Sequence, residues 1–374
     1  MRNFIALFWV AGLFLSVACR QADLYKPAIY EEKTTVRFED KAVRLFRLVN
    51  KNGMCVKVTN YAASLTDVVV PDRQGNFEHV VLGFDSVEHY LGKHPKFGAT
   101  VGRFANRIRN AEFKLQGQVY HLEKNNRGYS IHGGTKGFYR QVFETDTFYT
   151  VKDTAIVVFK YRSVHLEGGF PGNLELSIAY KLTNRNEIVL EYTATTDKPT
   201  VINLTNHSYF NLAGCKEAVS NHIYMIKADT ITPVDSMGIP TGELVAVAGT
   251  AYDYTSPKPA KIRMEEEGKG YDVNYKLSKL PGVLELAAVV VEPISGRVLK
   301  AYTTEPGMQF YIPDSNMDYL AGHGGRIYGK YYGFCLEMQH FPDSPNIPHF
   351  PTTNLLPGEV YRQVTVYKFE TTSE

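Results

Sequence analysis

The chain has 374 residues, of which 44% are hydrophobic and 21% are charged, a composition typical of a globular protein with a sizeable core. Its 41 basic and 39 acidic side chains leave a formal net charge of +2, which is too small for electrostatic binding of nucleic acid. The length fits either two average domains or one large all-β domain.

The N-terminal segment predicts export. An apolar run at residues 4–17 follows Arg2 and is too short to be a permanent membrane anchor. Residues 1–18 are therefore predicted to be a signal peptide. The lipoprotein type is favoured because Ser16-Val17-Ala18-Cys19 resembles a lipoprotein cleavage box, with Ser16 in place of the usual Leu. An ordinary cleaved signal with an incidental Cys19 is the alternative.

Export would place the protein in the periplasm. Lipidation of Cys19 would instead anchor it to the outer membrane, in contact with the membrane only through that lipid. Residues 19–35 are largely polar and aperiodic, and they are predicted to form a tether. We expect a monomer or a weak dimer.

Strand-like alternation begins near residue 36 and continues along the chain. The expected elements, in chain order, are strands at 43–48 and 54–59, a turn at 71–75, a helical turn at 86–91 capped by Asp85 or Ser86, a turn at 183–186, and a hairpin of 284–291 and 298–304. Other helical patterns are scarce, and 25 Tyr and 21 Phe suit broad sheets. Residues 36–372 therefore predict one all-β domain, a large antiparallel β-sandwich with few short helices and an open concave face.

Cysteine and histidine spacing predicts neither a disulfide framework nor a metal site. Cys55, Cys215 and Cys335 form no C-x-x-C pair and are expected to be buried, small apolar residues. The 11 His show no H-x-x-x-H pair, which argues against a metalloenzyme.

Three predicted strands carry hydrogen-bonding groups on one face, because side chains two residues apart share a face. These polar faces comprise Asn203, Thr205, His207 and Tyr209 in the first strand, Gln309 and Tyr311 in the second, and Glu337 and Gln339 in the third. A carboxylate in the middle of an apolar strand is costly when it is buried without partners. Taken singly, Glu337 is most simply a solvated residue, but three such strands together favour a polar binding site.

Loops supply further polar groups. Residues 103–109 hold three arginines beside Asn106, and they are expected to serve as structure or as substrate contacts. His132 precedes two glycines, which allow a sharp turn or a close approach to a ligand. Asp272 lies between two tyrosines. Each of these residues has a simple structural interpretation when it is considered alone.

Together, these segments resemble the aldose 1-epimerase (galactose mutarotase) family over nearly all of residues 36–370. The segments that carry the resemblance are residues 60–63, 71–75, 81–85, 97–108, 206–212 and 333–339. Two positions depart from the family pattern: Lys96 replaces a usual aromatic residue, and Val273 stands where a His often follows the Asp. Both departures bear on sugar preference.

The resemblance implies a large antiparallel β-supersandwich and an isomerase that interconverts the α and β anomers of free aldoses such as glucose and galactose. It implies His207 as general acid and Glu337 as general base, without a metal or organic cofactor. The implied sugar contacts are Asn106, Arg107, His132, Tyr209, Asp272 and Gln309. For such chemistry His207 must hold a proton near neutrality, which a nearby Glu337 carboxylate would favour.

Three other functions remain open at this stage. A glycoside hydrolase would need two carboxylates beside the glycosidic oxygen, and Glu337 and Asp272 could be that pair. A carbohydrate-binding lipoprotein would keep the polar faces without needing an acid and a base. An epimerase of phosphorylated sugars would need an arginine cluster for the phosphate, which the sequence does not show.

Overall fold

The computed structural model describes residues 26–317 and 321–372. The predicted signal peptide and Cys19 lie outside these residues. Strand β1 (Ala28–Glu32) falls inside the segment expected to be a tether, and it pairs along its whole length with β4 (Leu45–Val49). The sheet begins this early because Ile29 packs against the hydrophobic core.

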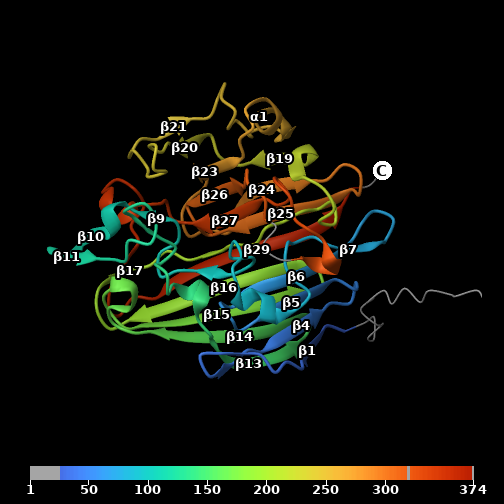
Figure 1. Cartoon of the computed structure of the whole chain (residues 1–374), viewed down its shortest axis with the longest axis horizontal. Helices are drawn as coiled ribbons and strands as arrows, with labels where there is room; N and C mark the ends of the chain where they lie inside the picture. Colours follow the sequence, from blue (N-terminus) through green and yellow to red (C-terminus); the bar gives the residue numbers. More distant parts are fainter. Residues whose placement is uncertain (1–25, 318–320, 373–374) are drawn as a thin grey trace, which may run out of the picture.

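The largest sheet has nine antiparallel strands and crosses the molecule in Figure 1 from green β13–β16 at the lower edge to orange β24 and β25 above. In spatial order it comprises β13 (Glu144–Val151), β14 (Thr154–Ser163), β15 (Leu174–Thr183), β16 (Glu187–Thr196), β29 (Tyr361–Thr371), β25 (Arg297–Thr303), β24 (Glu285–Val291), β19 (Ile223–Ile226) and β22 (Lys258–Pro259). The predicted hairpin is β24–β25, and the predicted turn at 183–186 joins β15 to β16. Both predictions are confirmed.

Two five-stranded antiparallel sheets complete the main framework. The N-terminal sheet has the order β1, β4, β5 (Cys55–Thr59), β6 (Ser64–Pro71) and β7 (Phe77–His79). The site sheet has the order β21 (Val245–Ala246), β20 (Thr230–Thr232), β23 (Tyr271–Lys276), β26 (Gly307–Ile312) and β27 (Cys335–Gln339). One contiguous cluster of buried apolar side chains draws on all three sheets, with Phe46 from β4, Phe159 from β14 and Phe310 from β26.

The other strands of the described residues form short two-stranded ladders. They are β2 (Arg37–Phe38) with β3 (Lys41–Ala42), β8 (Thr100–Val101) with β18 (Thr205–Asn206), β9 (Arg107–Ile108) with β12 (Ser130–Ile131), β10 (Glu112–Leu115) with β11 (Gln118–His121), and β17 (Thr200–Val201) with β28 (Asn354–Leu355). The architecture is therefore all-β, as expected.

Helices are short. In the part of the chain that the structure describes, the α-helix α1 covers Lys261–Glu266 and the other helical segments are 3-10 turns. The helical turn expected at 86–91 is confirmed at Val87–Leu91, where the Ser86 hydroxyl accepts a hydrogen bond from the Glu88 amide at 3.3 Å. No helix within 26–317 and 321–372 is long and apolar enough to cross a membrane.

Candidate active site

The site sheet aligns the predicted polar residues in cross-strand rows. Strand pairing places Asn274 of β23 opposite Gln309 of β26, and Gln309 opposite Glu337 of β27. A neighbouring row comprises Asp272, Tyr311 and Cys335. Because side chains alternate between faces, these two rows share one face of the sheet. Val273, one of the departures from the family pattern, instead packs in the apolar core.

His207 reaches this face from an irregular segment. Its N–H donates to the Ala99 carbonyl at 2.9 Å, and its carbonyl accepts from the Gly98 N–H at 3.0 Å. Gly98 has a φ of +64°, and a Cβ built there would lie 1.7 Å from the Leu65 carbonyl oxygen. Only glycine therefore allows the backbone to approach closely enough to hold His207.

The prediction of one continuous strand across residues 202–210 is wrong in its extent. Only Thr205–Asn206, strand β18, belongs to a ladder. Asn203 forms an isolated bridge with Phe104, and Phe210 forms isolated bridges with Val81 and Phe334. The segment changes partners along its length because it crosses between sheets, so no single ladder extends through it.

His207 and Glu337 face each other, with 3.7 Å between Nε2 of the imidazole and Oε1 of the carboxyl group. The two residues are only 5% and 2% exposed. Behind the imidazole, the Cys335 thiol lies 3.7 Å from Nδ1. The Tyr209 ring stacks on His207 at a centroid distance of 5.1 Å. Tyr209 thus contacts the candidate acid directly, and its contact with sugar stays a prediction.

Burial controls the protonation of this pair. It raises the pKa of Glu337 to about 8, with the Asp272 charge acting in the same direction and Lys96 and Arg107 opposing it. Burial also lowers the pKa of His207 to about 3, and the Lys96 charge adds to this effect. Burial penalises both charged forms, which favours a neutral His207 and a protonated Glu337 near neutrality. This direction is opposite to the sequence expectation that His207 holds the proton.

Four predicted sugar contacts form one hydrogen-bonded network. Asp272 accepts hydrogen bonds from Arg107 Nη2, at 3.1 Å, and from the Gln309 side-chain amide. Arg107 Nη1 lies 3.3 Å from the Asn106 side-chain oxygen. The network fixes the orientation of each group before a ligand binds.

His132 joins the site from the loop after β12. Its Nδ1 accepts a hydrogen bond from the Asn106 N–H at 3.2 Å, which leaves the proton of the neutral ring on Nε2. Burial lowers the pKa of His132 well below its ordinary value. Its ring meets the ring of His207 edge to face at 5.4 Å. All eight predicted catalytic and sugar-binding residues therefore belong to one contiguous constellation.

Three buried polar atoms in one row have no hydrogen-bond partner among the described residues. They are Asn274 Oδ1, Gln309 Oε1 and Glu337 Oε2. Asn274 and Gln309 also line a small cavity together with Asn106, Arg107 and Asp272. Buried polar atoms are almost always paired, so this row is suited to a ligand rich in hydroxyl groups.

The arginines of residues 103–109 have three different roles. Arg103 is 2% exposed and donates to the carbonyls of Pro171 and Gly172, so it is structural. Arg107 belongs to the site, whereas Arg109 pairs with Asp343 at 3.3 Å.

Sequence reasoning assigned no site role to Asn274 or Cys335, and it noted Lys96 only as a departure from the family pattern. The Lys96 ammonium lies 4.9 Å from the Tyr139 ring centroid, and its charge acts on His132, His207 and Glu337. Strand alternation could have found Cys335, because it shares a face with Glu337 two residues on.

This fold and this site define the galactose mutarotase-like class of isomerases. The galactose 1-epimerase of Lactobacillus acidophilus superposes with a TM-score of 0.80 at 28% identity, covering 93% of this chain and 100% of that one. An aldose epimerase homologue from C. elegans also gives 0.80, at 29% identity over 87% and 98% of the two chains.

Sequence comparison narrows the assignment. The aldose 1-epimerase family model matches residues 44–368. Human galactose mutarotase is 41% identical over 316 residues, which cover 84% of this chain and 90% of the human protein. Aldose 1-epimerase of Escherichia coli K12 is 36% identical, covering 87% of this chain and 95% of that protein. The chain belongs to the aldose 1-epimerase family.

Proposed function

We propose that the protein is an aldose 1-epimerase that interconverts the α and β anomers of free aldoses such as glucose and galactose. The observation that carries this proposal is the buried His207–Glu337 pair, 3.7 Å apart, at the end of a row of unpaired polar atoms. The hydroxyl groups of a pyranose ring can hydrogen-bond to that row, and its hemiacetal can exchange protons with the pair.

The chemistry needs one proton shared by two groups. Ring opening removes the proton of the C1 hydroxyl and delivers a proton to the ring oxygen, so one base and one acid suffice. We assign the base to the Glu337 carboxylate and the acid to the His207 imidazolium, the form reached when the shared proton moves from Glu337 to His207. Rotation about the C1–C2 bond exposes the other carbonyl face, and the reverse transfers close the ring.

The hydrolase alternative receives less support from the site. Asp272, the second carboxylate it would need, already accepts hydrogen bonds from Arg107 and Gln309. That arrangement suits a group that orients substrate hydroxyls. A binding protein, in turn, gains nothing from a buried Glu337 whose Oε2 has no hydrogen-bond partner among the described residues, because its burial opposes folding.

Polarimetry of freshly dissolved α-D-glucose and α-D-galactose tests the function. We expect the protein to accelerate the approach to anomeric equilibrium. His207→Asn and Glu337→Gln should each lower kcat by about 10²–10⁴-fold, the usual contribution of proton transfer. Asp272→Asn and His132→Asn should mainly raise KM. A near-wild-type kcat in either of the first two variants would reject its assigned role, and release of sugar from glycosides would favour the hydrolase.

We further propose that the protein is exported and anchored by a lipid on Cys19. The apolar run at residues 4–17 and the cleavage-box resemblance support this proposal. Labelling of expressing cells with radioactive palmitate should mark the wild type and leave Cys19→Ala unlabelled. If neither protein is labelled, the proposed lipid anchor is rejected.

A further inference from the structure

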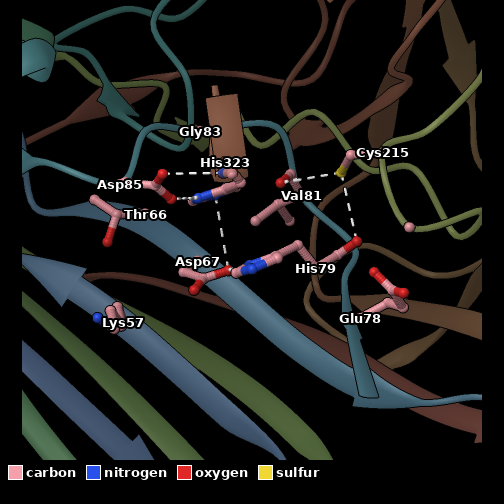
Figure 2. Close-up of polar contacts among 12 residues, drawn as sticks. Lys57, Thr66, Asp67, Glu78, His79, Val81, Gly83, Asp85, Cys215 and His323 are labelled. Atoms are coloured by element: carbon pink, nitrogen blue, oxygen red, sulfur yellow. Dashed lines mark hydrogen bonds and ion pairs between the residues drawn. The ribbon is translucent and has the colours of Figure 1, made fainter. Parts of the chain in front are cut away.

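A second cluster of ionisable side chains lies between the N-terminal sheet and the loop at residues 321–325 (Figure 2). His79 Nδ1 is 2.7 Å from Asp67 Oδ1, and His323 Nε2 is 3.7 Å from the same oxygen. On its other side, His323 Nδ1 faces Asp85 Oδ1 at 3.3 Å. The cluster shares no residue with the His207–Glu337 site.

Local backbone features bring these groups together. A β-bulge in β6 leaves Thr66 without a partner in β5, between the pairs Val58–Leu65 and Lys57–Asp67, and bulges redirect the neighbouring side chains. Gly83 gives His323 room, because a Cβ there would lie 2.8 Å from His323 Nε2.

The His323 imidazole has the features of a metal ligand. It is 2% exposed, and Nε2 has no hydrogen-bond partner among the described residues. Asp85 binds Nδ1 and also accepts from the Gly324 N–H at 2.9 Å, so the ring is held with Nε2 toward Asp67. A carboxylate behind an imidazole is the usual arrangement at metal-binding histidines.

Charge also favours a cation. Asp67 is 6% exposed, and with neutral imidazoles the two carboxylates leave the cluster negatively charged. The Asp67 carboxylate is paired with the His79 ring at 2.7 Å, and a bound cation would offset the same buried charge. The Cys215 thiol is no candidate ligand, because it points to the carbonyls of His79 and Val81, as Figure 2 shows.

We propose that Asp67, His79 and His323 bind a divalent transition-metal ion of the zinc type, with water completing its coordination. Two imidazole nitrogens and one carboxylate oxygen suit zinc, whereas calcium and magnesium prefer more oxygen ligands. The three donor atoms all lie within 4.8 Å of one another, and donors around tetrahedral zinc are about 3.3 Å apart.

Binding requires one rearrangement. The rings of His79 and His323 stack at a centroid distance of 4.4 Å and an interplanar angle of 9°, and nitrogen lone pairs in parallel planes do not meet at one ion. The His79 side chain is 34% exposed, so its ring has room to turn out of the stack. The bound ion would then join β6, β7 and the 321–325 loop.

Calorimetric titration of the EDTA-treated protein with zinc chloride tests the site, together with thermal unfolding with and without zinc. The wild type should bind one zinc ion and unfold at a higher temperature when it is present. Asp67→Asn, His79→Gln and His323→Gln should lose this binding, and Asp85→Asn should weaken it by about 10–100-fold. His349→Gln, which removes an exposed histidine elsewhere, should bind like the wild type.

Two further variants separate this site from the catalytic pair, because His207, Cys335 and Glu337 also cluster closely enough to hold an ion. His207→Asn and Glu337→Gln should retain the zinc affinity of the wild type. Loss of zinc binding in these variants would overturn the proposal, as would undiminished binding in His79→Gln, the variant least exposed to folding defects. Absence of zinc binding by the wild-type protein would also overturn the proposal, because the cluster would then be a set of ion pairs only.

Discussion

Glu337 combines a catalytic assignment with a cost to folding. Its pKa is about 8 in the folded protein, against an ordinary value of 4.5, chiefly because it is buried. Between these values folding must take up a proton, so the stability of the fold decreases as the pH rises from 4.5 to 8. Natural active sites commonly sacrifice stability in this way.

Glu337→Gln should therefore stabilise the protein while it abolishes most activity. Gln mimics the protonated carboxyl group, and the gain in unfolding free energy should be on the order of 3 kcal/mol at pH 7, as an upper bound. Urea denaturation at several pH values checks this prediction. The gain should grow toward pH 8 and vanish below about pH 4.5, and a difference that is independent of pH would contradict the argument.

Lys96 should set the alkaline limit of activity. The active site needs one proton on the pair, so kcat/KM should fall as the pH rises through the pKa of Glu337, about 8. The Lys96 charge lowers that pKa, and its removal in Lys96→Met should shift the falling limb to higher pH. Lys124→Met, at an exposed position, is the matched control, and equal profiles for both variants would contradict the role of Lys96.

At the level of single residues, sequence reasoning selected a candidate acid and a candidate base that lie 3.7 Å apart, but it did not anticipate that burial favours a proton on Glu337 over one on His207. The identities of His207 and Glu337 are visible in the motifs, whereas their depth of burial depends on side chains from distant segments. The Asp67–His79–His323 cluster shows the same limit, because its two histidines are 244 residues apart (323 minus 79) and form no local motif.

Among the elements, the loop before β8 matters most for placing His207. Gly98→Ala would add a Cβ 1.7 Å from the Leu65 carbonyl at a φ of +64°, and the backbone contact with His207 would be lost. We expect a loss of several kcal/mol of stability and of most activity. Gly75→Ala is the control, since its φ is +86° but no atom lies within 4 Å of the added Cβ, and it should cost about 1 kcal/mol.

Thermal unfolding and polarimetry of both variants check this prediction. Similar losses for the two substitutions would show that backbone strain alone, and not the close approach at Gly98, determines the effect.

Strands joined by tight turns were predictable from sequence, and the irregular elements were not. The β24–β25 hairpin joins two neighbouring apolar strands through a short turn that contains Pro293 and Gly296, so it is determined locally. The sequence of the 202–210 segment alternates, but its partners, including Val81, Val101 and Phe334, come from three other parts of the chain. Local pattern therefore identified the segment as strand-like and missed both its broken pairing and its burial at every position.

On the scale of the whole molecule, composition and alternation predicted one all-β body but not its division into a nine-stranded and two five-stranded sheets. Sheet order depends on non-local pairing, such as that of β16 with β29, whose paired residues Ala194 and Tyr361 lie far apart in sequence. A single pattern of alternation is compatible with many such orders.

The early start of β1 restricts where a lipidated form of this enzyme could work. Ala28 lies only nine positions after Cys19 (28 minus 19), a span of about 30 Å for a fully extended chain. Attached in this way, the enzyme would stay next to the bilayer surface and diffuse in two dimensions. It would then process sugars as they pass through the thin layer of solvent beside the lipid headgroups.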